Sequence, residues 1–102
     1  MKILICEDET GVVDILKRYL KHKGFDADHA LNGRAALELI KKRNYDIVFL
    51  DINIPELTGI EILKYMKENH HKAKVIILTG YPGVTSDFCT SLGADNYLEK
   101  PI

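Results

Sequence analysis

The sequence has little of several features that would indicate a specialised class of protein. Its two cysteines, Cys6 and Cys89, lie far apart without the paired spacing of a zinc site. Its 14 basic and 15 acidic residues nearly balance, so no net field draws the chain onto nucleic acid or an anionic membrane. The apolar run at residues 3–6 is too short for a signal peptide or a membrane span. The composition therefore predicts a cytoplasmic protein with reduced thiols and no nucleic acid or membrane partner.

The chain also lacks repeats, low-complexity segments and a linker. Its 102 residues, of which 46% are hydrophobic, suffice for one packed domain and are too few for two. We therefore expect residues 1–102 to form a single domain.

Five segments have the character of strands. The apolar runs at residues 3–6, 47–50 and 75–78 are continuous rather than alternating, which is typical of central strands covered on both faces. Residues 25–29 alternate loosely and are polar, which fits an edge strand. Residues 96–98 form a short last strand.

Helical spacing of apolar residues fills the segments between these strands. The first helix is expected to end at Lys23-Gly24, the second to follow the turn Asn32-Gly33, and Thr58 to cap the third. A weaker fourth helix is expected over residues 86–92, before Gly93. The predicted apolar faces are Val12, Leu16, Tyr19 and Leu20, then Ala36, Leu37 and Ile40, then Ile62, Leu63 and Met66.

The order of elements is therefore βαβαβαβαβ with short connections. Right-handed crossovers make this an α/β protein with a parallel sheet and helices on both faces. Ligands in such sheets bind beyond the carboxyl ends of the strands. That rule predicts where the functional site lies.

The residues at those strand ends are Glu7, Asp8, Asp51, Thr79 and Lys100. Carboxylates gathered there would repel one another by about 4 kcal/mol per pair at 4 Å, so a cation is expected among them. Oxygen ligands from two or three carboxylates, completed by water, suit Mg²⁺. With a lysine and a hydroxyl beside the metal, the set complements a phosphoryl group, and Asp51 is its central nucleophile.

The chain strongly resembles the receiver domain of two-component response regulators, the family of the bacterial chemotaxis regulator. The matching stretches are ILICEDE, LDINIPELTG, IILTG and GADNYLEKPI, which stand in the family's order and spacing. The resemblance implies a flavodoxin-like, doubly wound sheet of five parallel strands in the order 2-1-3-4-5.

It also implies a role for each strand-end residue. Asp51 matches the phosphoacceptor, and the metal site would comprise Asp51, Asp8 as a direct ligand, Glu7 through water, and the backbone carbonyl of Asn53. The remaining roles are phosphoryl contacts by Thr79 and Lys100, an inward-turning switch at Tyr97, and a cis bond before Pro101.

Tyr81, two residues after Thr79, is a further hypothesis of our own. Its position at the rim of the site suggests that it shields the acyl phosphate from water.

The resemblance implies partners as well. A sensor histidine kinase or phosphotransfer protein would supply the phosphoryl group, and an effector domain or protein would receive the signal. The family continues into a fifth helix beyond Ile102, so the chain is expected to lack it. Its absence would expose either Val75 and Ile77 or Ile76 and Leu78, lowering stability or favouring a homodimer.

Two alternative functions share features with this sequence. A phosphatase of the haloacid dehalogenase type also uses a strand-end aspartate and Mg²⁺, but needs a second acid where this chain has Asn53. A pseudo-receiver that only binds partners would need a damaged site, and here the acceptor, threonine and lysine are all present. We therefore expect a phosphorylation switch that catalyses only its own phosphorylation and autodephosphorylation.

Two charged features are expected to lie outside the site. The sequence predicts that Glu9 is a helix-terminal charge that the helix dipole favours. The pair His70-His71 is predicted to be a solvated helix end, since adjacent residues there point in different directions.

Overall fold

Five parallel strands form one sheet in the order β2-β1-β3-β4-β5, which confirms the predicted fold. The structure is a computed structural model and describes residues 1–80 and 90–100. The strands are β1 (Ile3–Cys6), β2 (Ala27–Ala30), β3 (Ile47–Asp51), β4 (Lys74–Thr79) and β5 (Asn96–Glu99).

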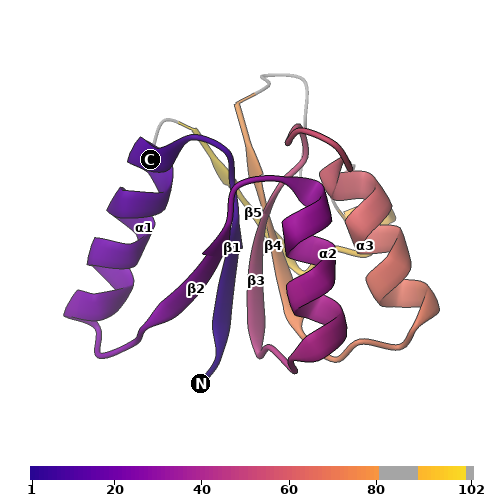
Figure 1. Cartoon of the computed structure of the whole chain (residues 1–102), viewed down its shortest axis with the longest axis horizontal. Coiled ribbons are helices and arrows are strands. Elements are labelled where there is room, and N and C mark those ends of the chain that lie inside the picture. The colour runs from indigo at the N-terminus through magenta and orange to yellow at the C-terminus, as the bar shows by residue number, and fades with distance from the viewer. Residues whose placement is uncertain (81–89, 101–102) are drawn as a thin grey trace.

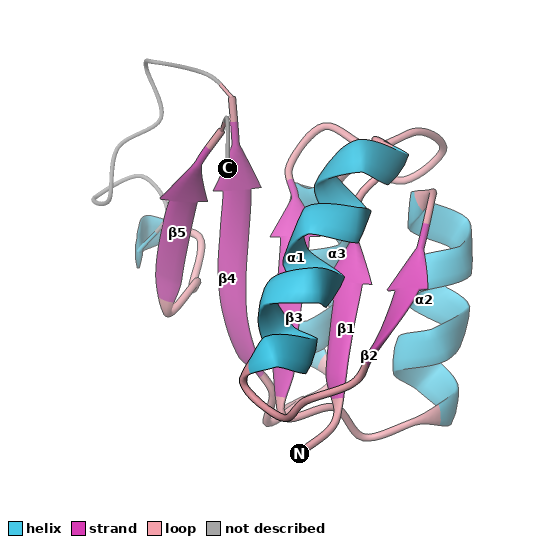
Figure 2. Cartoon of the chain, turned by 90° about the vertical axis from the view of Figure 1, so that its left-hand side faces the viewer, coloured by secondary structure: helices cyan, strands magenta, loops and turns pink. Residues whose placement is uncertain are grey.

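Helices cover both faces of the sheet. The helix α1 (Thr10–His22) lies on one face, and α2 (Gly33–Lys42) and α3 (Gly59–Glu68) lie together on the other (Figures 1 and 2). Thr90 and Ser91 are helical, but Leu92, the last residue of the predicted fourth helix, lies in a turn, and residues 86–89 lie outside the described residues. None of the helices in the described part of the chain combines the length and apolar character needed to cross a membrane.

Local side-chain and backbone bonds fix the helix ends. The Ala35 N–H donates to Asn32 Oδ1 at 2.8 Å, and the Glu61 N–H donates to Thr58 Oγ1 at 3.2 Å, so Thr58 is the cap that the sequence predicts. At the end of α1, Gly24 has a φ of 92°, a left-handed conformation that favours glycine.

The continuous apolar strands supply two cores, because successive side chains of a strand point to opposite faces. Under α1, the buried Val13, Leu16 and Leu20 pack with strand residues that include Ile5 and Leu78. Under α2 and α3, a larger cluster contains the alternate strand residues together with helix residues, among them Leu4, Val48, Leu50, Ile40, Ile62, Leu63 and Met66.

The face of the first helix and the start of the edge strand differ from the sequence prediction. Tyr19 is predicted on the apolar face of the first helix but is 61% exposed, and Val13 is buried instead. The tyrosine ring lies outside the core, where the Lys23 ammonium stands 5.7 Å from its centroid. The edge strand begins at Ala27 rather than residue 25, because the Phe25 N–H closes the end of α1 by donating to Leu20 O at 2.9 Å.

The fourth strand shows which face of the sheet is less covered. Val75 and Ile77 are buried under α2 and α3, whereas Ile76, on the α1 face, is only partly buried. On the same face Leu78 is buried, but its neighbour Leu98 on β5 is 38% exposed. Of the two faces considered from the sequence, the α1 face is thus the more exposed.

Gly59 allows α3 to begin directly against the end of β3. A Cβ added at Gly59 would stand 2.3 Å from Asp51 O and 2.8 Å from Ile52 Cα. Both contacts are with backbone, so neither can be relieved by a side-chain rotation.

We expect Gly59→Ala to lower the free energy of unfolding by about 1–3 kcal/mol, because the backbone after β3 must shift to admit the methyl group. Urea denaturation measures the change. Gly11→Ala is the matched control, since nothing lies within 4 Å of its added Cβ, and it should stabilise α1 by up to about 1 kcal/mol. Equal unfolding free energies for the two variants would contradict the proposed clash.

Candidate functional site

Three polar side chains are buried at the carboxyl ends of the strands. Glu7 follows β1, Asp51 ends β3 and Thr79 ends β4, and the exposed fractions of the whole residues are 0%, 5% and 1%. The arrowheads of the parallel strands meet at one edge of the sheet (Figure 2). The strand-end rule applied to the sequence therefore locates a polar cluster that the structure does bring together.

Lys100 supplies the positive charge of this cluster. Its Nζ lies 2.5 Å from Glu7 Oε1, 3.1 Å from Asp51 Oδ2 and 3.1 Å from Glu9 Oε1. Its backbone N–H donates to Thr79 O at 2.7 Å, which fixes the lysine beside the end of β4. A cation from the chain itself thus offsets part of the repulsion between the carboxylates.

Glu7 is a fully buried carboxyl group whose charged form is disfavoured by burial. Its Oε2 accepts the Glu9 N–H at 3.0 Å, while Oε1 lies close to the Lys100 ammonium without the alignment of a hydrogen bond. Burial raises the pKa of the Glu7 carboxyl from 4.5 to about 7, although Lys100 and the Glu9 N–H act to lower it. Burial also acts to lower the pKa of Lys100, but the carboxylates outweigh it and the net shift is upward.

Asp51 is held from two sides. Its Oδ1 accepts the Asn53 N–H at 3.1 Å, and its Oδ2 accepts from Lys100. Behind it, the Gly59 N–H donates to Ile52 O at 2.8 Å and closes the loop that leads into α3. The carboxylate of Asp51 is therefore fixed at the sheet edge.

The oxygen ligands fit a hard divalent cation. Glu7, Asp8 and Asp51 each offer a carboxylate oxygen, and these oxygens lie within 4.8 Å of one another. Asp8 is exposed, and a cavity of about 280 Å³ opens beside it, lined by Asp8, Glu9, Asp51, Asn53, Gly80 and Lys100. Carboxylates with open space for water are the ligand set that Mg²⁺ prefers.

Glu9 belongs to this site, and its assignment to the helix terminus alone was wrong. It stands at the N-cap position of α1, yet its side chain caps no N–H and instead contacts Lys100. Ser, Thr, Asp and Asn are the usual N-caps, so a glutamate there was a signal that its carboxylate serves another contact.

Thr79 and Tyr97 lie on the same face of the sheet. Tyr97 pairs with Ile77, which lies two residues before Thr79 on β4, and parallel partners point to the same side. Tyr97 is partly buried and packs against the core under α2 and α3. Tyr81 and the bond before Pro101 lie outside the described residues.

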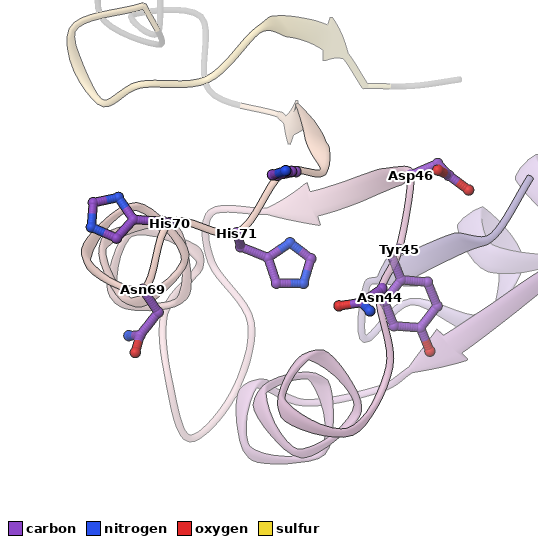
Figure 3. Close-up of a pocket in the computed structure, with 7 residues that line it drawn as sticks. Asn44, Tyr45, Asp46, Asn69, His70 and His71 are labelled. Carbon is purple, nitrogen blue, oxygen red and sulfur yellow. The ribbon is translucent and has the colours of Figure 1, made fainter.

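A larger cavity, of about 550 Å³, lies at the opposite edge of the sheet (Figure 3). Asn44–Asp46 and Asn69–Lys72 line it. The ring of His71 points toward Asn44 and Tyr45 while that of His70 points away, so the two histidines diverge as the sequence predicts (Figure 3). His71 is nevertheless only partly exposed. Among the described residues, the carboxylate group beside Lys100 is the one cluster suited to a metal.

Comparison with known proteins agrees with this geometry. The family model for the response regulator receiver domain matches residues 3–102. The cell cycle response regulator CtrA of Brucella ovis is 30% identical over 103 residues, which cover 100% of this chain and 44% of that protein. The chain thus spans less than half the length of CtrA.

Solved structures show the same fold. The receiver domain of the Francisella response regulator 1452 has 31% identity and a TM-score of 0.91, over 99% of this chain and 84% of that one. The response regulator TrrA of Thermotoga maritima, in complex with Mg(2+)-BeF, has 36% identity and a TM-score of 0.86, over 99% of this chain and 87% of that one.

The raised pKa of Glu7 predicts how stability depends on pH. Because the pKa is about 7 in the folded chain and 4.5 ordinarily, the folded state binds this proton more tightly. The stabilisation is complete below pH 4.5 and is lost as the pH rises through 7, a loss of about 3 kcal/mol for one group. Glu7→Gln removes this loss.

Urea denaturation with a chelator present, from about pH 5 to 8, tests this expectation. The free energy of unfolding of Glu7→Gln should rise relative to the wild type across the range. Glu38→Gln, an exposed position on α2, should run parallel to the wild type. Parallel profiles for all three proteins would show that Glu7 titrates normally.

Proposed function

We propose that Asp51 is the phosphoacceptor, from the premise that the chain belongs to the family of response regulator receiver domains. The family is one of two-component phosphoacceptor switches rather than turnover enzymes. The observation that supports the assignment is the position of the Asp51 carboxylate, fixed between the Asn53 N–H and the Lys100 ammonium and beside Glu7 and Asp8.

In the proposed reaction, a carboxylate oxygen of Asp51 attacks phosphorus in line with the leaving group. A bond forms from this oxygen to phosphorus as the bond from phosphorus to the phosphohistidine nitrogen breaks, and the imidazole leaves with the electron pair. Lys100 offsets the negative charge on the equatorial phosphoryl oxygens.

Glu7, Asp8, Asp51 and the Asn53 carbonyl would hold Mg²⁺. When bound, the ion would supply charge neutralisation for the phosphoryl oxygens. The similar protein TrrA is solved in complex with Mg(2+)-BeF, which supports the proposal that this chain also binds Mg²⁺. Residues 1–102 would then be the receiver domain, with a histidine kinase or phosphotransfer protein upstream and an effector downstream.

The switch would run from Asp51 to Tyr97. Phosphorylation adds charge and acceptor oxygens, which can attract the Thr79 hydroxyl and free space on the face that Tyr97 shares. The shift in population between the two states is limited by how much the free energy of these contacts differs between them.

Incubation with acetyl phosphate and Mg²⁺, followed by intact mass spectrometry, tests the phosphoacceptor. The wild type should gain one phosphoryl group, and Asp51→Asn should gain none because an amide is not a nucleophile here. Asp46→Asn, whose Oδ2 accepts the Lys2 N–H at the other end of the sheet, is the matched control and should be phosphorylated normally. No gain in the wild type, or an equal gain in Asp51→Asn, would refute the assignment.

The switch can be tested with 3-fluorotyrosine and ¹⁹F NMR. Phosphorylation should shift the Tyr97 resonance in the wild type, whereas Thr79→Val, which keeps the shape but removes the hydroxyl, should lose most of that shift. The Tyr65 resonance, from α3, is the internal reference. A full shift in Thr79→Val would exclude the hydroxyl as the link.

A further inference from the structure

Glu9 contacts the ammonium group that the phosphoryl group would need. Its Oε1 lies 3.1 Å from Lys100 Nζ, which in turn lies 3.1 Å from Asp51 Oδ2. The Glu9 side chain is 64% exposed and that of Lys100 is 14% exposed. The exposed Glu9 therefore contacts the partly buried ammonium from the solvent side, whereas Glu7 and Asp51 contact it with buried carboxylates.

The side chain of Glu9 can be changed without disturbing its backbone contact. Its N–H donates to Glu7 Oε2, and any residue except proline keeps that bond. Its carboxylate caps no N–H of α1, so removing the charge costs the helix no cap. A substitution here removes the contact with Lys100 and keeps the backbone bond to Glu7.

Glu9 also lines the cavity that leads to Asp51. A phosphodonor brings negative charge into this cavity, where the Glu9 carboxylate repels it. Lys100 must then exchange Glu9 for a phosphoryl oxygen. Both the repulsion and the competition for Lys100 oppose the transfer.

We propose that Glu9 is a positioning residue that holds Lys100 from the solvent side and slows phosphorylation of Asp51. The inference rests on the proposed function of Asp51, so it needs one test that depends on phosphorylation and one that does not.

The independent test measures how readily Lys100 reacts with acetic anhydride, followed by peptide mass spectrometry. In Glu9→Gln the ammonium loses its outer partner, so Lys100 should be acetylated at least about twofold faster than in the wild type. Glu38→Gln, which removes an exposed charge from α2, should leave the rate unchanged. Equal acetylation rates in Glu9→Gln and the wild type would refute the proposal that Glu9 holds Lys100.

The dependent test measures the initial rate of phosphorylation by acetyl phosphate at low ionic strength. Glu9→Gln should react about two- to fivefold faster than the wild type, the range expected of one exposed charge. Glu38→Gln, which removes an exposed charge from α2, should stay at the wild-type rate. The advantage of Glu9→Gln should shrink as salt is added.

The outcomes separate the two proposals. If the wild type is phosphorylated and Glu9→Gln is no faster, Glu9 does not restrain the reaction, whatever the role of Asp51. If the wild type takes up no phosphate, both the role of Asp51 and the restraint by Glu9 fail, and the acetylation rates alone decide whether Glu9 holds Lys100. Matching urea denaturation curves for the variants would exclude misfolding as the cause of any difference.

Discussion

The rest of the site depends on the charge balance around Lys100 Nζ. Glu7 and Asp51 present side chains that are 0% and 7% exposed, and two buried carboxylates at one sheet edge repel unless a cation lies between them. The ammonium that meets this need comes from the far end of the chain, after β5, although β3 and β4 separate that strand from β1. The Lys100 N–H bond to Thr79 O fixes where its side chain starts. The strand order thus determines the electrostatics.

Much of the fold could be predicted because its strands are simple. Three continuous apolar runs between polar turns have few other stable arrangements, and Thr58 marks a helix start through a bond that depends only on local sequence. The wrong predictions concern residues whose place depends on contacts that a local pattern does not contain. Tyr19 and Leu20 both suit a helix face, and only packing against β1 and β3 decides that Leu20 enters the core. Phe25 was assigned to a strand because its own backbone bond to Leu20, which ends α1, is not visible in a pattern.

The site also contains some residues that the sequence could predict and one that it could not. The carboxyl ends of parallel strands must meet, so the proximity of Glu7, Asp51, Thr79 and Lys100 follows from topology alone. Glu9 could not be placed in this way, since its contact depends on how far two long side chains reach and not on where a strand ends. Repulsion among carboxylates led the sequence argument to a metal ion. The structure shows that Lys100 already offsets part of that repulsion, so a bound cation would complete the balance rather than create it.

This sharing of Lys100 has a consequence for the proposed switch. The Lys100 ammonium contacts three carboxylates at once. A phosphoryl group added at Asp51 would therefore compete with these carboxylates for the ammonium. The backbone of Lys100 is bonded to the end of β4, and β5 pairs with β4 through Leu78 and Leu98 and through Thr79 and Glu99. A change of partner at the Lys100 side chain therefore acts on a segment whose backbone is tied to Thr79. In the proposed mechanism, the Thr79 hydroxyl at the end of β4 and the Lys100 ammonium just after β5 respond to the same phosphoryl group. This shared response couples the chemistry to the face where Tyr97 lies.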